Sequence, residues 1–366
     1  MKILLLTTDA FGAYGGIAQY NRDLLLSLCI LPDVTSVTAI PLTLSHPIGD
    51  LPPKLKYVTQ GAKSKFLYLI VALRAALSKP DIIICGHINL LSLCLLIKVF
   101  TRAPLVLLVY GVDVWQKPLR LFHTGFLKKI TQIWSISHFT QQKMQAWSKA
   151  PETLFRIVPN AIHLEKYGLA AKDVNLVEKL GLKNKKVIVM MGRLATIERW
   201  KGIDEVLNIL PNLISKEPNL VLIIIGDGDD KPRLDKRVKK IGLSENVIFT
   251  GYVSEDKKSA FLHLADAFVM PTRAEGFGFV FLEALASGIP VVASKIDGSR
   301  EALMGGKLGR LVDPDNPNEL EAEALAALSD PHQISSDLQY FSFNAFKNRV
   351  SKLLKEFSGN HINILH

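Results

Sequence analysis

Short, wholly apolar runs alternate along this chain with longer segments of helical periodicity. Strands that are buried on both faces read as continuous apolar runs, whereas a surface helix repeats its apolar residues every three or four positions. Successive parallel strands need a crossover connection, which is usually a helix. The alternation therefore predicts an α/β fold in which parallel sheets are covered by helices on both faces.

The predicted strands are 2–6, 36–40, 81–85, 105–109, 133–135, 156–158, 186–191, 220–225, 247–250, 267–270 and 291–293. The predicted helices are 17–28, 66–77, 90–100, 139–147, 203–214, 232–240, 254–264, 280–286 and 343–357. A chain of 366 residues exceeds the usual size of one core, and the pattern turns polar between residues 160 and 186.

We therefore predict two Rossmann-like doubly wound domains, 1–165 and 166–342, that face each other across a cleft. The helix from about 343 to 366 is expected to pack back onto the first domain; the alternative is an amphipathic helix lying on a membrane. In open α/β sheets, ligands bind beyond the carboxyl ends of the strands, so the functional residues are expected there.

Composition excludes several classes. The chain is 48% hydrophobic and 21% charged, which is typical of a globular protein. Its longest uncharged apolar stretch, residues 82–97, is shorter than the roughly 18 to 20 residues that a spanning helix needs. The three cysteines, Cys29, Cys85 and Cys94, lack the short spacings of thiolate metal sites. We expect a cytoplasmic protein with reduced thiols.

The positive charge lies in the first half. Residues 1–180 contain 20 Lys+Arg and 10 Asp+Glu, and the remaining residues contain 24 of each. Such a field favours an anionic partner, such as a membrane surface, a charged glycolipid or nucleic acid. The alternative is that the cations are scattered for solubility. The basic, apolar stretch 54–77 favours a membrane-associated acceptor and peripheral contact with the cytoplasmic membrane.

Two glycine-containing loops follow predicted strands. In the first, Gly15 and Gly16 directly precede a helix, whose free N–H groups suit a phosphate; a plain tight turn is the alternative. In the second, Arg193 stands at a strand end and Lys201 at a helix start. These two cations can converge on one anion, although both could instead be solvated, and Arg199 in the same loop competes with them.

The third loop reads EGFGFVFLEALASGIPVVAS over residues 275–294. Gly276 and Gly278 let the backbone approach a ligand, and Glu275 and Glu283 flank them. The predicted helix begins at residue 279 or 280, which puts Glu283 in its first turn or so. The helix dipole explains a glutamate at position 283 adequately, but it explains Glu275 poorly, because Glu275 precedes an apolar run.

With these loops in place, the chain resembles the retaining glycosyltransferases of family four, which have the two-domain GT-B fold. The most specific match is the Glu-x7-Glu signature, Glu275 to Glu283. Supporting matches are Gly15–Gly16, Val158–Asn160, Gly192–Leu194, Lys201–Gly202, Ile224–Gly228 and Gly251–Val253.

The resemblance implies a hexosyltransferase that uses a nucleotide-diphosphate sugar, such as a UDP- or GDP-hexose, and a glycan or lipid-linked acceptor. Arg193 and Lys201 would hold the diphosphate, Glu275 the sugar hydroxyls and Glu283 the ribose. The other expected donor contacts are Gly15, Gly16, Gly226, Tyr252, Val253, Gly276, Phe277, Gly278 and Phe279. The departing diphosphate would take the acceptor proton, and no separate cofactor is implied.

Two departures from the family pattern affect the site. Tyr110–Gly111 replaces a His-Gly pair of many relatives, which makes Asp113 a candidate acceptor contact. His87 follows another strand and is a second candidate near the reacting sugar, although a lone histidine is more often structural. The loop between Arg193 and Lys201 is longer than in many relatives, so Lys201 is assigned on weaker grounds than Arg193.

Metal and nucleic-acid chemistry are not expected. The patterns Asp227–Asp229 and Asp313–Asp315 could hold a divalent cation, but turn chemistry explains both. A nucleic-acid role lacks aromatic interleaving or a known module. The rival functions are another nucleotide-sugar enzyme on this plan, such as an epimerase or a phosphorylase, and a non-catalytic nucleotide-sugar-binding subunit.

Overall fold

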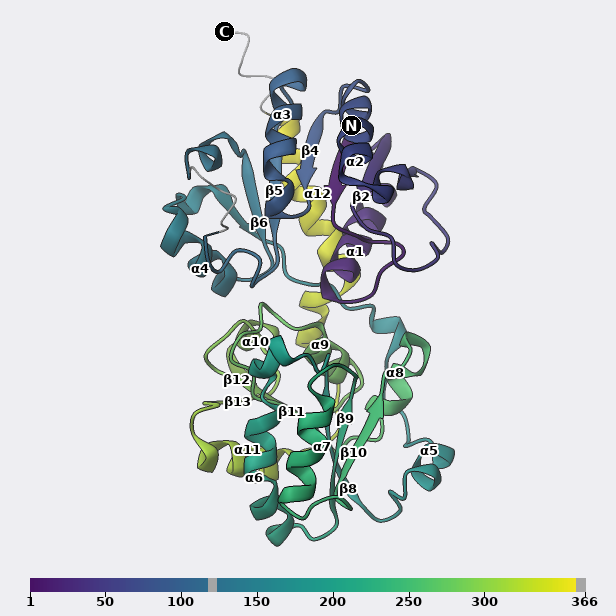
Figure 1. The fold of residues 1–366 in the computed structure, drawn as a ribbon, viewed down its shortest axis with the longest axis vertical. Helices are drawn as coiled ribbons and strands as arrows, with labels where there is room; N and C mark the ends of the chain where they lie inside the picture. The colour runs from purple at the N-terminus through teal and green to yellow at the C-terminus, as the bar shows by residue number, and fades with distance from the viewer. Residues whose placement is uncertain (118–123, 360–366) are drawn as a thin grey trace. The chain divides into compact units, whose positions relative to one another are not determined.

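The chain forms two compact α/β units (Figure 1). The computed structural model describes residues 1–117 and 124–359. Unit 1 contains residues 1–161 together with the chain from Phe343 onward, and unit 2 contains residues 162–342.

Unit 1 is built on a seven-stranded parallel sheet with the order β3-β2-β1-β4-β5-β6-β7. Its strands are β1 Lys2–Thr7, β2 Ser36–Pro41, β3 Leu55–Tyr57, β4 Ile82–Cys85, β5 Leu105–Val109, β6 Gln132–Ser135 and β7 Phe155–Ile157. Its helices are α1 Gly16–Ile30, α2 Lys65–Ala76, α3 Leu91–Thr101, α4 His138–Ser148 and α12 Phe343–Gly359. The central strands β4, β5 and β6 are buried throughout, as their continuous apolar runs require.

The last helix, α12, packs against α1 within unit 1 (Figure 1). The Phe346 ring meets the Tyr20 ring edge-on at 5.5 Å, and Val350 and Leu354 are buried beside it. Arg156 forms an ion pair with Glu356 at 2.9 Å. The large apolar side chains of α12 from Phe346 to Phe357 are thus buried within unit 1 and are not available to a membrane. The part of this predicted helix from residue 360 onward lies outside the described residues.

Unit 2 is built on a six-stranded parallel sheet with the order β10-β9-β8-β11-β12-β13. Its strands are β8 Lys186–Met191, β9 Leu220–Ile225, β10 Val247–Gly251, β11 Ala267–Met270, β12 Val291–Ser294 and β13 Arg310–Val312. Its helices are α5 Val174–Lys179, α6 Ile203–Lys216, α7 Lys231–Lys240, α8 Glu255–Leu262, α9 Phe279–Ala286, α10 Ser299–Ala302 and α11 Pro317–Ala327.

Short 3-10 helices complete the structure. They are η1 Thr59–Lys63, η2 Ile88–Leu90, η3 Thr124–Lys129, η4 Glu152–Leu154, η5 Leu164–Lys166, η6 Thr196–Lys201, η7 Met304–Gly306 and η8 Ser336–Phe341.

The structure confirms the predicted α/β class and every predicted strand and helix to within a few residues. It adds two edge strands, β3 and β13, that are too short and too exposed to read as apolar runs. It also adds α5 inside the predicted polar seam, and the helices α10 and α11. Helix α11 carried a readable signal, because Asn316 caps it by accepting from the Glu319 amide and Pro317 is its first residue.

Candidate functional site

The predicted donor residues of unit 2 lie in loops at one edge of its sheet. Strands β8, β9, β10, β11 and β12 run parallel, so the loops that follow them start at the same edge. Arg193 follows β8, Gly226 follows β9, Tyr252 follows β10, and Glu275 comes after β11. The topology therefore brings together segments that are as far apart in the sequence as residues 192 and 283.

A carboxylate that the sequence did not reveal bridges the two predicted diphosphate cations. Glu198, in η6, forms an ion pair with Arg193 and lies 3.5 Å from the Lys201 ammonium. The Arg193 guanidinium is largely exposed, whereas Lys201 and Glu198 are mostly buried. Hydrogen bonding to Glu198 raises the pKa of Arg193 further above its ordinary value. The two cations are thus held on one short segment, and Glu198 partly neutralises their charge.

Glu275 lies within reach of the same charges. Burial raises the pKa of its carboxyl; Lys201 and a hydrogen bond from the Gly276 backbone lower it, and the neighbouring carboxylates Asp297 and Glu198 raise it. Glu275, Lys201 and Glu198 therefore form one electrostatic cluster, although they come from the loops after β11 and β8. A half-buried carboxyl of this kind can accept hydrogen bonds from the neutral hydroxyl groups of a sugar.

The Glu275 loop is fixed by Asp297, which the sequence did not single out. This buried carboxylate accepts hydrogen bonds from the Thr272 hydroxyl at 2.6 Å, the Glu275 amide at 2.8 Å and the Ser299 hydroxyl at 2.6 Å. Burial raises the pKa of Asp297, and these hydrogen bonds oppose the rise. Asp297 follows β12, so it ties the loop after β11 to the loop after the neighbouring strand.

Helix α9 begins at the predicted glycine loop. Gly278 is the N-cap of α9 and has φ +90°, a conformation that residues other than glycine disfavour. A Cβ at this position would lie 2.5 Å from the Phe281 ring. Phe277 is buried edge-on against Phe341. Gly276 is buried too, and Phe279, the first helical residue, is half-buried. The first N–H groups of a helix have no acceptor inside it, so this end of α9 favours an anion.

Glu283 corrects one expectation. It lies in the second turn of α9 and not in the first, so the helix-dipole explanation does not apply to it. Its buried carboxylate forms an ion pair with Lys258 of α8 at 2.8 Å, and Lys258 also pairs with Glu255 at 2.7 Å. Burial raises the pKa of Glu283, while Lys258 and a hydrogen bond from Tyr167 lower it.

Gly226, Tyr252 and Val253 follow β9 and β10 at the same edge. A Cβ on Gly226, which has φ +140°, would lie 1.9 Å from the carbonyl oxygen of Gly192. Only a glycine fits at position 226, because the loops after β8 and β9 contact each other there. This packing explains the glycine without a ligand. Tyr252 is exposed and Val253 is half-buried. Both side chains lie on the carboxyl edge.

In unit 1, Gly15 and Gly16 are exposed at the start of α1. Gly15 is the N-cap with φ +106°, and no side chain caps this helix. The first amides of α1 thus stand at the carboxyl edge of the sheet, directly after β1, where an anion would suit them.

The two acceptor candidates of unit 1 also follow strands. His87 comes after β4, and its Nδ1 accepts a hydrogen bond from the Asn89 amide at 3.1 Å, which caps η2. This bond leaves the proton of the neutral ring on Nε2, and burial lowers the pKa of the imidazole. Asp113 comes after β5 and accepts from the Tyr110 amide at 3.2 Å. Burial raises the pKa of Asp113 to about 7.

The structure thus brings Arg193, Lys201 and Glu275 together in unit 2, with Gly276 and Gly278 beside Glu275. Glu283 shares the edge but points to a different partner, Lys258. The residues missed by sequence reasoning are Glu198, Lys258 and Asp297. Each of these side chains interacts with a residue of another loop or helix, or with a residue further along the same loop. The periodicity of the sequence does not reveal such interactions.

No group of His, Cys, Asp or Glu residues in the described part of the chain is arranged to hold a metal ion. The two Asp-x-Asp patterns make contacts with backbone amides. Asp227 accepts from the Gly228 amide at 2.8 Å and Asp229 from the Thr196 amide at 2.8 Å. Asp313 accepts from the Asp315 amide at 3.0 Å. The contacts of Asp227 and Asp313 are local, as turn chemistry requires, whereas Asp229 binds an amide of the loop after β8.

Comparison with known proteins first defines the class. Residues 174–347 match the family model of the glycosyl transferases group 1. The chain superposes on the Anabaena protein Alr3699/HepE, solved with UDP and glucose, with a TM-score of 0.74 and 21% identity over 97% of this chain and 99% of that one. It also superposes on the lipopolysaccharide outer core galactosyltransferase WaaB, with a TM-score of 0.74 and 16% identity over 97% and 99% of the two chains.

Curated relatives match part of the chain. A GDP-mannose-dependent phosphatidylinositol monomannoside mannosyltransferase of Mycolicibacterium smegmatis is 32% identical over 43% of this chain and 43% of its own length. A phosphatidyl-myo-inositol mannosyltransferase of Mycobacterium leprae is 33% identical over 59% of this chain and 54% of its own length. The chain thus aligns with about half the length of these relatives. The family model covers residues 174–347, a little under half of the chain, and the chain has the GT-B fold, as predicted from the sequence.

Proposed function

We propose that this protein transfers a hexosyl unit from a nucleotide-diphosphate sugar to a glycan or lipid-linked acceptor, in the synthesis of a cell-surface polysaccharide or glycolipid. The observation that carries the proposal is the cluster of Arg193, Lys201 and Glu275 at the carboxyl edge of unit 2, beside the amino end of α9. Two cations and a helix start suit a diphosphate, and the half-buried carboxyl of Glu275 suits sugar hydroxyls.

The donor would be divided among these groups. Arg193, Lys201 and the amides at the start of α9 would take the diphosphate, with Gly15 and Gly16 contributing from unit 1. Glu275 would accept from hydroxyls of the sugar and Glu283 from the ribose. Glu198 would have to release the two cations as the diphosphate binds, because it pairs with both of them.

We infer that transfer retains the anomeric configuration. The acceptor oxygen would bond to the anomeric carbon on the face from which the bond to the diphosphate breaks. The electron pair of that bond would pass to the leaving oxygen, which would then take the acceptor proton. The protein would act by stabilising the negative charge that develops on the diphosphate. His87 and Asp113 would contact the acceptor or the reacting sugar from unit 1.

The comparisons support the choice of substrates. The mycobacterial relatives are named as mannosyltransferases of phosphatidylinositol or its mannoside, one of them GDP-mannose-dependent, and the Anabaena structure contains UDP and glucose. A UDP- or GDP-hexose donor fits these names, and a lipid-linked acceptor fits the mycobacterial relatives. We further propose that the protein needs no metal, and that it works in the cytoplasm at the membrane surface. No helix of the described residues has the length and apolarity to span a bilayer.

The test is a panel of UDP-, GDP- and ADP-hexoses incubated with the isolated protein in excess chelator, with released nucleoside diphosphate as the readout. At least one donor should be hydrolysed slowly, and Glu275→Gln should remove that turnover. A protein that binds nucleoside diphosphate but turns over none of the donors would be the non-catalytic subunit. One that binds none of them would overturn the proposal.

A further inference from the structure

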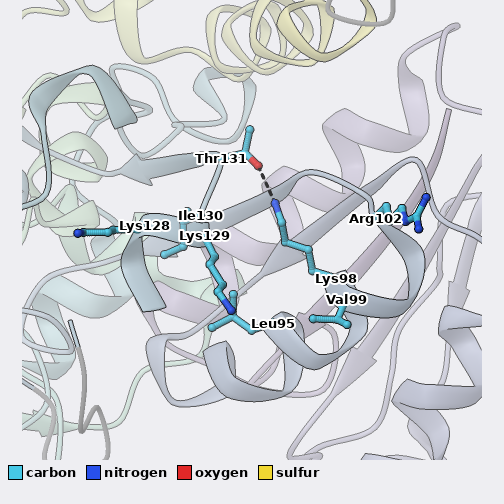
Figure 2. A pocket seen from close by; sticks show the side chains of 8 residues that line it. All are labelled: Leu95, Lys98, Val99, Arg102, Lys128, Lys129, Ile130 and Thr131. Carbon is cyan, nitrogen blue, oxygen red and sulfur yellow. Dashed lines mark hydrogen bonds between the residues drawn. The ribbon is translucent and has the colours of Figure 1, made fainter. Parts of the chain in front are cut away.

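A basic hollow lies on unit 1, away from the carboxyl edge of its sheet. Its volume is about 520 Å³ and it lies between the end of α3 and η3 (Figure 2). Its lining residues are Leu95, Lys98, Val99, Arg102, Lys128, Lys129, Ile130 and Thr131. The Thr131 amide donates to the carbonyl oxygen of Leu105, the first residue of β5. The hollow is therefore at the amino edge of the sheet, opposite the edge that carries His87 and Asp113.

All the charged side chains that line the hollow are positive. Its described lining contains four cations and no carboxylate. Figure 2 shows Lys128 and Arg102 at opposite ends, with Lys98 and Lys129 between them. The Lys98 ammonium meets the neutral Thr131 hydroxyl at 3.3 Å, and burial lowers the pKa of Lys98. The surrounding sequence supplies no counter-charge, since residues 114–151 contain six Lys+Arg and no Asp or Glu.

Large apolar side chains are exposed beside these cations. On the last turns of α3, Val99 is 66% exposed and Phe100 is 72% exposed, and Leu96 on the preceding turn is exposed as well. Exposed apolar side chains next to Lys and Arg are typical of a surface that enters the headgroup layer of a membrane. The interior of a soluble anion site does not need them.

The simpler explanations cover only part of the pattern. The negative end of α3 favours Lys98 and Arg102, but Lys128 and Lys129 come from η3. A single small anion would require the cations to converge, whereas here they are spread along the hollow (Figure 2). A surface that carries many phosphates fits this spread, because each cation can meet a different headgroup.

We propose that this face, the carboxyl end of α3 together with η3, docks on a bilayer that contains anionic phospholipids. The four cations meet headgroup phosphates, and Val99 and Phe100 enter the interfacial layer. The inference rests on the lipid-linked acceptor of the proposed function, and it places the docking surface at α3 and η3.

The experiment measures binding of the full chain to vesicles of phosphatidylcholine and phosphatidylglycerol in equal parts, by co-sedimentation. The double variant Lys128→Gln with Lys129→Gln should bind roughly thirtyfold more weakly, from the loss of two cations near an anionic surface. Val99→Ser with Phe100→Ser should bind roughly tenfold more weakly through the loss of buried apolar area. The matched control is Lys239→Gln with Lys240→Gln on α7, which removes the same charge from another exposed site and should bind as the wild type does.

Binding of UDP and GDP should be unchanged in all three variants, which shows that each is folded. If the wild type binds vesicles but turns over no nucleotide sugar, the docking surface is supported and the proposed function is refuted. Wild-type binding that survives 0.5 M salt, or the loss of binding in Lys63→Gln with Lys65→Gln but not in the η3 variant, would overturn the inference. So would a preference of the wild type for RNA or DNA over vesicles, or full competition by inorganic phosphate at millimolar concentration.

Discussion

Replacement of Glu198 by glutamine should tighten the binding of a nucleoside diphosphate. Glu198 lies 3.5 Å from Lys201 and also pairs with Arg193, so an incoming diphosphate has to compete with a carboxylate that is already in place. At an effective dielectric constant of about 20, charges at that distance attract by roughly 5 kcal/mol. Most of this attraction is offset by solvation, and Arg193, which is 68% exposed, contributes little because solvent screens it.

A net gain of about 1–2 kcal/mol is expected when the competing carboxylate is removed, which is a roughly five- to thirtyfold lower Kd. The assay is isothermal titration calorimetry with UDP and GDP in excess chelator, for the wild type, Glu198→Gln and the control Glu245→Gln. The control removes an exposed carboxylate of unit 2 and should leave Kd unchanged. Weaker binding by Glu198→Gln, with an unchanged melting temperature, would refute the competition and would mean that Glu198 positions the two cations for the ligand.

Three further predictions concern stability and metal. Burial raises the pKa of Asp113 to about 7, so the folded state favours the protonated carboxyl. The protonated carboxyl makes its whole contribution to the free energy of unfolding below the pKa of the unfolded state. That contribution is lost as the pH rises to about 7. In thermal unfolding, Asp113→Asn should therefore have the same free energy of unfolding as the wild type at pH 4, and a value up to about 4 kcal/mol higher at pH 8. The same difference between the two proteins at both pH values would contradict this. Gly226→Ala should lower the free energy of unfolding by about 2–4 kcal/mol, because its Cβ would meet the Gly192 carbonyl oxygen. Gly242 also has a positive φ, +73°, but open space around it, so Gly242→Ala should lower the free energy of unfolding by less. Equal losses in the two variants would rule out the contact. Activity on the donor found in the panel should be unchanged in excess chelator, and loss that manganese restores would contradict the metal-independent proposal.

The fold was predictable because its main strands are continuous apolar runs, and burial on both faces of a parallel sheet requires them. Runs such as LVLIII of β9 leave few alternatives. The edge strands escape this logic: β3 reads LKY and β13 reads RLV, and both are partly exposed. Short strands of this kind are set by pairing with a neighbour, which the local sequence does not encode.

The site was predictable to the extent that it depends on strand ends. Arg193 and Glu275 follow strands, and parallel pairing places the loops after those strands at one edge. The partners were not predictable, because Lys258 reaches Glu283 from a different helix and Asp297 reaches the Glu275 amide from the loop after the next strand. Such contacts depend on packing between elements, and residue spacing along the chain does not reveal them.

The central claim is that Glu275 and Glu283 serve different parts of the donor. It is tested most directly by steady-state kinetics of Glu275→Ala and Glu283→Gln on the donor that the wild type uses. Glutamine is chosen at position 283 because alanine would leave the buried Lys258 without its main partner. The account predicts that Glu283→Gln mainly raises KM, through weaker donor binding, and that Glu275→Ala mainly lowers kcat. The same change in both parameters for both variants would contradict it.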